Sequence, residues 1–135
     1  MALEKVSKTI PMKKYDSTIP LISIHIPKCA GTSFAEILTA WFGRGFLQHY
    51  PDEKNNKSPK KHNIYIGKHF KPRLCIHGHF NNNRGNGVQD YYPNVDQYIM
   101  ILRDPFEVYL SNYFYVKRLR KDAYRPIPLL LITMI

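Results

Sequence analysis

The segment His25–Ser33, HIPKCAGTS, combines one lysine with the residue types of a loop that binds an anion. Gly31 allows the backbone to turn tightly, and Ser33 with Glu36 has the spacing of a helix capping box. A junction of strand, loop and helix leaves backbone N–H groups pointing outward. These groups, the helix dipole and the Lys28 ammonium all favour a negative charge. The segment therefore predicts a phosphate or sulfate site, with a merely solvated loop lysine as the alternative.

Two other loops that bind oxyanions do not fit this segment. In the nucleotide-binding pattern G-x-x-x-x-G-K-[ST] the lysine follows the second glycine, whereas Lys28 precedes Gly31 here. A phosphatase-type loop built on Cys29 needs an arginine six positions later, and Ala35 stands there. The sequence thus indicates a loop with neither a Walker lysine nor a nucleophilic cysteine.

A second candidate is the histidine pair in His77-Gly78-His79, which follows the apolar segment RLCI. Gly78 indicates a bend at the carboxyl end of a strand, and open α/β sheets bind ligands at that edge. A neutral histidine there can take a proton from a substrate hydroxyl. The H-x-H spacing is also compatible with a metal, but no third ligand follows at a suitable spacing, so we expect no metal. A histidine with a purely structural role is the other alternative.

A third candidate lies where the apolar run 99–102 ends in Arg103 and Asp104. Asp104 is suited to cap a helix, and Glu107 has the spacing of a capping box. An arginine at a strand end can bind a phosphate through two parallel N–H bonds, although Arg103 can equally just end the strand. Ser111 lies about two turns further along the predicted helix.

Two strand–loop–helix units would position these groups. Residues 20–26 and 97–102 are apolar runs typical of strands covered on both faces. Each is followed by apolar residues at helical spacing, which predicts a helix packed on the sheet. These are Phe34, Ile37, Leu38, Trp41 and Phe42 in the first helix, and Phe106, Tyr109, Leu110, Tyr113 and Phe114 in the second. The first helix is expected to end near Gly43 or Gly45.

The pattern predicts a three-layer α/β fold with a parallel sheet in which 20–26 and 97–102 are the central strands. Its strand–loop–helix unit is P-loop-like. Residues 64–66 and 73–76 are predicted as shorter strands, and 48–63 as a surface loop.

Composition indicates one folded domain that carries excess positive charge. The chain has 135 residues, with 44% hydrophobic and 13% aromatic content, which argues against disorder. The formal net charge of +10 implies an acidic partner such as a nucleotide, a nucleic acid, an anionic glycan or a membrane surface. The two cysteines, Cys29 and Cys75, are too few for a disulfide framework or a metal site, so we expect free thiols.

Three segments together, in the same order, resemble the sulfotransferases that use 3′-phosphoadenosine-5′-phosphosulfate (PAPS). HIPKCAGTSF is similar to the HIPKTGGTS-type loop of the carbohydrate branch, which acts on heparan- and chondroitin-like acceptors. HGH at 77–79 and LRDPFEVYLSNY at 102–113 are similar to two further segments of that family. The resemblance covers residues 20 to about 118. The sequence departs from the family at Cys29 and Ala30, which are both small, and at Val108, where many relatives carry a second arginine.

The resemblance implies transfer of a sulfuryl group from PAPS to a hydroxyl of a carbohydrate or similar acceptor, with no metal. It implies that His79 is the catalytic base, with His77 as the second choice, and that Lys28 stabilises charge on the bridging oxygen. The loop that binds the 5′-phosphosulfate would consist of Lys28, Cys29, Ala30, Gly31, Thr32 and Ser33. Arg103 and Ser111 would bind the 3′-phosphate.

The chain divides into a flexible leader (1–19), a nucleotide-binding domain (20–125) and an apolar tail (126–135). The leader lacks the apolar core of a signal peptide, and the nine-residue run IPLLLITMI is too short to span a bilayer. We therefore expect a cytoplasmic protein without a transmembrane segment. Since the family continues beyond the RDP helix, we also expect a C-terminally truncated member whose fold is incomplete at that end.

Three alternatives remain open. The chain could be an inactive truncated fragment that binds an adenine nucleotide or another polyanion. A kinase-like enzyme would share the fold, but the sequence has no Walker lysine and no convincing magnesium carboxylates. A basic nucleic-acid-binding protein would explain the charge, yet the aromatic residues fall on helical stripes and not on an exposed sheet.

Overall fold

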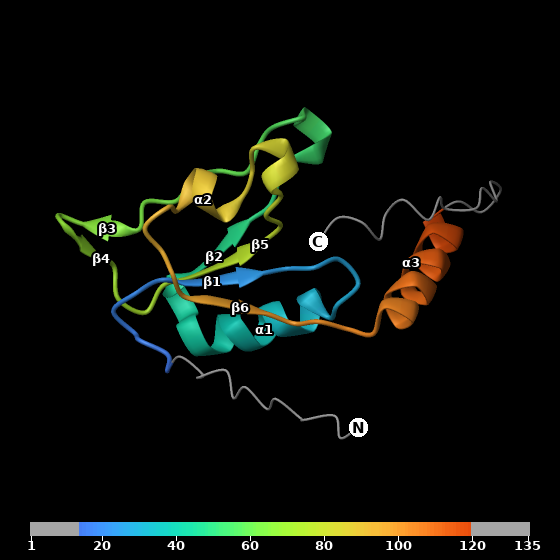
Figure 1. Cartoon of the computed structure of the whole chain (residues 1–135), viewed down its shortest axis with the longest axis horizontal. Helices are drawn as coiled ribbons and strands as arrows, with labels where there is room; N and C mark the ends of the chain where they lie inside the picture. Colours follow the sequence, from blue (N-terminus) through green and yellow to red (C-terminus); the bar gives the residue numbers. More distant parts are fainter. Residues whose placement is uncertain (1–13, 120–135) are drawn as a thin grey trace, which may run out of the picture.

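The computed structural model describes residues 14–119, which are organised around a four-stranded parallel sheet (Figure 1). The strands lie in the order β2-β5-β1-β6, and every neighbouring pair is parallel. They are β1 (Leu21–Ile24), β2 (Phe46–His49), β5 (Cys75–Gly78) and β6 (Tyr98–Met100). A separate antiparallel pair consists of β3 (Tyr65–Ile66) and β4 (His69–Phe70).

The helices complete a layered α/β arrangement. They are α1 (Gly31–Phe42), α2 (Val88–Tyr91) and α3 (Pro105–Leu119), with short 3₁₀ turns at Gly43–Gly45, Glu53–Asn55 and Asn82–Arg84. In Figure 1, α1 covers one face of the sheet, α2 and its neighbouring loops lie over the other, and α3 stands beyond the end of the sheet. The predicted α/β class with a parallel sheet and flanking helices is therefore confirmed.

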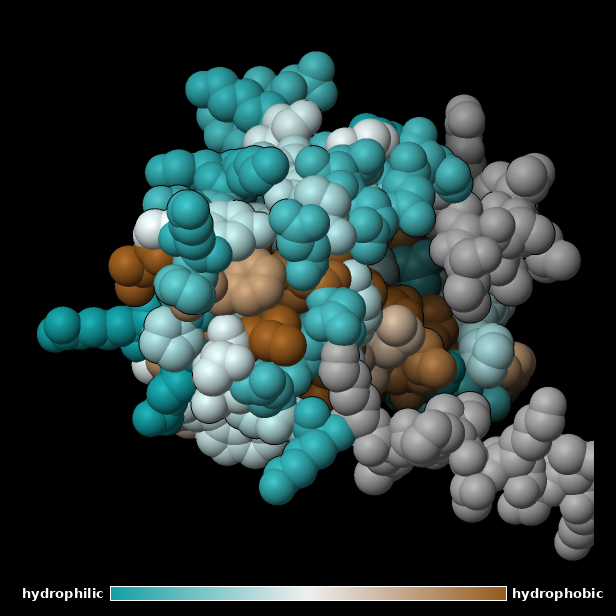
Figure 2. Space-filling view, turned by 60° about the vertical axis from the view of Figure 1, so that its left-hand side comes forward, coloured by the Kyte–Doolittle hydropathy of each residue, from teal (hydrophilic) through white to brown (hydrophobic). Residues whose placement is uncertain are grey.

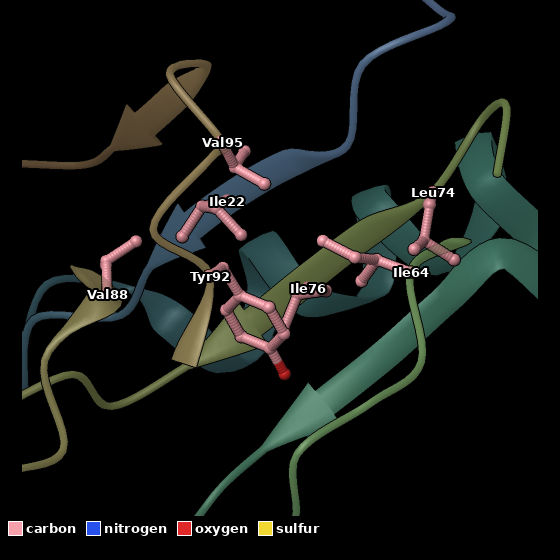
Figure 3. Close-up of a cluster of buried hydrophobic side chains, with 7 residues drawn as sticks. All are labelled: Ile22, Ile64, Leu74, Ile76, Val88, Tyr92 and Val95. Atoms are coloured by element: carbon pink, nitrogen blue, oxygen red, sulfur yellow. The ribbon is translucent and has the colours of Figure 1, made fainter. Parts of the chain in front are cut away.

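Two apolar clusters hold the layers together, one on each face of the sheet. On the α1 face, Leu21 and Cys75 pack with Leu38 of α1. On the opposite face, Ile22 and Ile76 belong to a larger cluster with the segments 64–74 and 88–95 (Figure 3). Adjacent residues of β1 thus point to opposite faces, as the alternation of a strand requires. Because both faces are covered, the first two residues of β1 and of β5 are apolar and buried.

The predicted identity of the central strands is half right. β1 is central and β6 is its parallel neighbour, but β6 lies at the edge and β5 takes the other central position. The run that was expected to be buried is largely exposed: Met100 is 46% and Leu102 is 69% accessible. The run 97–102 is longer and more apolar than RLCI, so it was predicted to be a central strand. Hydrophobicity does not determine the order of the strands, which places β5 at the centre and β6 at the edge. β2, inserted before β5, was not predicted at all.

The first helix differs from expectation at its start and agrees at its end. Its N-cap is Ala30 and no side chain caps it, so the capping box of Ser33 and Glu36 does not form. The helix begins earlier, at Gly31, which moves Ser33 into the first turn. It ends at Gly43 as predicted, where the backbone φ of 52° suits glycine.

The apolar stripe of α1 is only partly buried. Leu38 is fully buried, and Phe34 and Phe42 pack beside it. Ile37 and Trp41 are 45% and 63% accessible, against the prediction. These two side chains lie beyond the edge of the contact between α1 and the sheet.

The second helix is capped as predicted but does not pack as predicted. The Asp104 Oδ1 accepts hydrogen bonds from the N–H groups of Phe106 and Glu107, at 2.9 and 3.2 Å. No residue of α3 is buried among those the structure describes, and Phe106 and Phe114 are 67% and 59% accessible. The stripe does not pack on the sheet, because α3 stands beyond the end of the sheet (Figure 1). On the side of the molecule that Figure 2 brings forward, apolar side chains also reach the surface between hydrophilic regions.

Most of the predicted leader and the whole predicted tail lie outside the described residues. Within residues 14–119, no helix is both long enough and apolar enough to span a membrane.

Candidate functional site

The loop between β1 and α1 is tightly wound at the carboxyl edge of the sheet. Lys28 and Ala30 have φ values of 66° and 57°, a region that non-glycine residues seldom occupy. The Cys29 N–H donates to the Ile26 carbonyl at 3.2 Å, and the Cys29 side chain is buried. Such left-handed residues cluster at ligand-binding loops, where the surrounding structure holds them in place.

Gly31 is required by the close approach of a histidine ring. A Cβ at this position would lie 1.8 Å from Nε2 of His25, which no side chain could tolerate. Thr32 and Ser33 follow in the first turn of α1, and both are exposed. The predicted anion loop is therefore a strained turn that leads into an accessible helix N-terminus.

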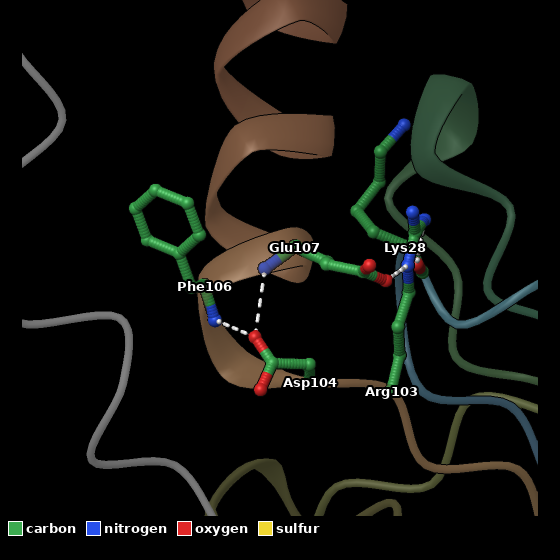
Figure 4. A network of polar contacts seen from close by, with 5 residues as sticks. All are labelled: Lys28, Arg103, Asp104, Phe106 and Glu107. Atoms are coloured by element: carbon green, nitrogen blue, oxygen red, sulfur yellow. Dashed lines mark hydrogen bonds and ion pairs between the residues drawn. The ribbon is translucent and has the colours of Figure 1, made fainter.

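The structure brings the predicted cations of both junctions together (Figure 4). Arg103 follows β6 and Lys28 follows β1, and a guanidinium N–H of Arg103 reaches the Lys28 carbonyl at 3.5 Å. The Lys28 ammonium lies 3.9 Å from the centre of the Tyr115 ring of α3, a cation–π distance. The Arg103 Nε donates to a Glu107 carboxylate oxygen at 2.8 Å. The Arg103 side chain reaches the Lys28 backbone because β1 and β6 are parallel neighbours.

Ser111 lies on α3, two turns beyond Arg103, and its side chain is half-buried. It is therefore on the same helix as Glu107 and Tyr115, which contact the two cations.

A cluster of histidines occupies the same edge of the sheet. The His25 ring is stacked on His77 at 5.3 Å and lies 4.6 Å from His79, measured between ring centres. The His25 Nδ1 is hydrogen-bonded to the Tyr50 hydroxyl at 2.8 Å, and the Tyr50 ring lies 5.1 Å from His79. Strand β1 delivers His25, β2 leads to Tyr50, and β5 delivers the other two. The phosphate-type loop and the HGH segment thus share one site, linked by His25.

Burial keeps these imidazoles neutral. Burial, together with the neighbouring His79 and His77, lowers the pKa of His25 to about 4. Burial also lowers the pKa of His77 and of His79, although Glu53 opposes the shift at His79. All three rings are therefore uncharged at neutral pH, which is the form that can accept a proton.

His77 and His79 differ in their access to solvent. His77 is 1% accessible, and its Nδ1 is hydrogen-bonded to the Ser23 hydroxyl at 2.9 Å. His79 comes after the last residue of β5 and is only half-buried. A substrate can reach His79 more easily than His77.

Several members of this cluster were missed by sequence reasoning. His25 stands inside the quoted HIPK segment, but no role was given to it. Tyr50 was placed in a surface loop, since no neighbouring residue in the sequence indicates its contacts with His25 and His79. His49 was also missed: it is fully buried and stacked on Phe80 at 4.6 Å. Their polar or aromatic types were visible, but their convergence depends on the strand order.

The two cysteines are free, as predicted, and both are buried; burial raises the pKa of Cys75 to about 12. Within residues 14–119, no group of three or more His, Cys, Asp or Glu side chains could hold a metal ion.

Comparison with known proteins places the chain in a family. The sequence profile of the sulfotransferase family matches residues 14–128, which include both junctions and the HGH segment. No curated protein and no solved structure matches the chain. Since the family match extends over most of the chain, the protein belongs to the sulfotransferase family.

Proposed function

We propose that this protein binds PAPS and transfers its sulfuryl group to a hydroxyl of a carbohydrate or a similar acceptor. The observation that carries the proposal is the meeting of Lys28 and Arg103 at the carboxyl ends of neighbouring parallel strands. A nucleotide with charged groups on both its 5′ and 3′ positions needs two cationic sites of this kind. Membership of the sulfotransferase family supports the reaction class.

The donor would be held at both of its charged ends. The 5′-phosphosulfate would lie against the exposed N-terminus of α1, in the loop of Lys28, Cys29, Ala30, Gly31, Thr32 and Ser33, where Thr32 and Ser33 would supply backbone N–H groups and hydroxyls. The 3′-phosphate would be bound by Arg103 and Ser111. The guanidinium suits this role because its N–H groups match phosphate oxygens in pairs.

The reaction would use His79 and Lys28 in complementary roles. PAPS supplies the activated sulfuryl group when bound. His79 would take the proton from the acceptor hydroxyl as that oxygen forms its bond to sulfur. Lys28 would stabilise the negative charge left on the bridging phosphate oxygen as the other S–O bond breaks. His77, held by Ser23, is the second choice for the base.

The first experiment measures nucleotide binding. Calorimetric titration with adenosine 3′,5′-bisphosphate, the product nucleotide, should show binding that is tighter than that of ATP. A single-stranded oligonucleotide serves as a control, because general polyanion binding would show a steep dependence on salt. Tighter binding of ATP, or no binding of the bisphosphate, would contradict the proposal.

The second experiment measures transfer from a radiolabelled donor to a panel of glycans and small alcohols. His79→Ala should lower transfer by about 10²- to 10⁴-fold and leave bisphosphate affinity nearly unchanged, because a base acts on the acceptor. His77→Ala serves as the matched control and should lower transfer less. Equal turnover by His79→Ala and the parent protein would exclude His79 as the base. Binding without any transfer would favour a nucleotide-binding protein over an enzyme.

A further inference from the structure

A carboxylate lies inside the proposed 3′-phosphate site. Glu107 is one helical turn after Arg103, and its Oε2 accepts a hydrogen bond from Arg103 Nε at 2.8 Å (Figure 4). We propose that Glu107 competes with the nucleotide's 3′-phosphate for Arg103, and so sets how tightly this protein holds a 3′-phosphorylated nucleotide. The inference rests on the proposed function, because it concerns the same site.

The ion pair between Arg103 and Glu107 is weak enough for an incoming phosphate to displace the carboxylate. The side chains of Arg103 and Glu107 are 42% and 56% accessible, so water screens their attraction. Their separation of four residues brings them together through local chain geometry alone. The remaining guanidinium contact, to the Lys28 carbonyl, is long at 3.5 Å. An incoming anion can therefore replace the carboxylate without unpacking a core.

The opposite role for Glu107 would be to orient Arg103 toward the phosphate. That role gains little here, since an exposed pair with a single short hydrogen bond restricts the guanidinium only weakly. A phosphate within reach of Arg103 would lie within about 6 Å of the Glu107 carboxylate, a distance at which like charges repel. The repulsion acts on a phosphate that carries nearly two negative charges. Repulsion therefore outweighs orientation, and removal of the Glu107 charge should tighten binding.

The competition has a selective consequence. A nucleotide that carries only a 5′-phosphate has no group to place at Arg103, so Glu107 should hardly affect it. A 3′-phosphorylated nucleotide must displace or approach the carboxylate. Glu107 thus reduces the difference in affinity between 3′-phosphorylated nucleotides and those that carry only a 5′-phosphate. It also favours release of the bisphosphate product.

The test is a set of calorimetric titrations of the full chain with adenosine 3′,5′-bisphosphate and adenosine 5′-monophosphate. Glu107→Gln should bind the bisphosphate about three- to tenfold more tightly, and a tenfold change corresponds to about 1.4 kcal/mol. Its affinity for the monophosphate should change less than about twofold. Glu36→Gln is the matched control, since Glu36 is an exposed acidic residue on α1, and it should behave like the parent protein.

A second background shows whether Glu107 acts through Arg103. In Arg103→Ala, adding Glu107→Gln should tighten bisphosphate binding less than it does in the parent background, because only the direct repulsion between the carboxylate and the phosphate is left to remove. A conservative Glu107→Asp variant should lie between the parent and Glu107→Gln, since it keeps the charge and shortens the reach. Circular dichroism of each variant verifies that α3 still forms.

Each outcome decides between the proposals. Unchanged or weaker bisphosphate binding by Glu107→Gln, with normal binding by the parent, would overturn the role of Glu107 and leave the proposed function intact. Equal tightening of both nucleotides would also overturn it, because it would indicate a general charge effect. Failure of the folded parent and of Glu107→Gln to bind the bisphosphate would overturn the proposed function together with this inference.

Discussion

The chain contains two strand–loop–helix units with a similar local sequence pattern. They differ in the position of the strand in the sheet and in the packing of the helix. In the first, β1 is a central strand and α1 packs on the sheet through Leu38. In the second, β6 is an edge strand and α3 has no buried residue within the described part of the chain. The first loop is wound tightly with two left-handed residues, whereas the second relies on an Asp104 cap. The first unit is thus anchored by burial and the second by local bonds.

The difference has a consequence for the candidate site. Lys28 stands on the anchored unit and Arg103 on the exposed one, and they touch only through a long hydrogen bond. The position of the proposed 5′ site is therefore fixed by the core. The position of the proposed 3′ site depends on α3 and its contacts with Lys28. Substitutions that are matched between the two units test this contrast.

The largest expected difference concerns the packing of the two helices. Leu38→Ala should lower the free energy of unfolding by about 2–5 kcal/mol, because it opens a cavity under a fully buried side chain. Leu110→Ala, at a side chain that is 37% accessible, should cost less than about 1 kcal/mol. Urea unfolding followed by circular dichroism measures both. Similar losses from the two substitutions would show that α3 is packed in solution as firmly as α1.

The next effect concerns the two cations. Lys28→Ala and Arg103→Ala should each weaken adenosine 3′,5′-bisphosphate binding by about 1.5–3 kcal/mol, as expected for a charged hydrogen bond. Only Lys28→Ala should also weaken adenosine 5′-monophosphate binding, since that nucleotide has no group at Arg103. Arg44→Ala removes an exposed cation elsewhere and is the control. An equal loss of both nucleotides in Arg103→Ala would contradict the division into a 5′ and a 3′ site.

The sequence predicted local features of the two units better than their environment. The run 20–26 correctly indicated a buried strand, Gly43 correctly marked a helix end, and Asp104 correctly indicated a cap, because each depends on a few neighbouring residues. The same patterns failed where position in the sheet matters. The run 99–102 is apolar but lies on an edge strand, and the stripe of α3 has no sheet to cover.

The sequence identified the motifs of the candidate site, but it did not show which side chains come together in space. The segments around Lys28 and Arg103 were recognisable, and β1 and β6 are parallel neighbours in one sheet, so the two residues lie at neighbouring strand ends. The contacts of His25 with Tyr50 and His79 could not be predicted, since they require the unpredicted strand β2 beside β5. The pairing of Arg103 with Glu107 was also missed, because the spacing of Glu107 indicated a capping box.

Stability should depend on pH through the anchored unit. Burial lowers the folded-state pKa of His25 to about 4, below its usual 6.5. The unfolded chain therefore binds a proton more readily, and stability should fall as the pH drops from about 6.5 to about 4. His25→Gln should flatten part of this dependence. His49, His77 and His79, whose pKa values burial also lowers, should supply the part that remains.

The measurement is the midpoint of urea unfolding of the parent and of His25→Gln, at several pH values between about 4 and about 8. An unaltered slope in His25→Gln would mean that the ring is solvated, and the anchored unit would be looser than the structure shows.

The smallest effect distinguishes the starts of the two helices. Asp104→Ala should cost about 1 kcal/mol of helix stability, because the N–H groups of Phe106 and Glu107 lose their acceptor. Ser33→Ala should cost almost nothing, since no side chain caps α1 and its first turn is held by the packed helix. Because α3 is not buried, the loss at Asp104 should show as faster amide exchange in α3 and not as a lower global midpoint. A comparable loss of stability from Ser33→Ala would indicate that the capping box predicted from the sequence does form in solution. Unchanged exchange in Asp104→Ala would show that α3 is held by contacts other than its cap, and the contrast between a unit anchored by burial and one held by local bonds would fail.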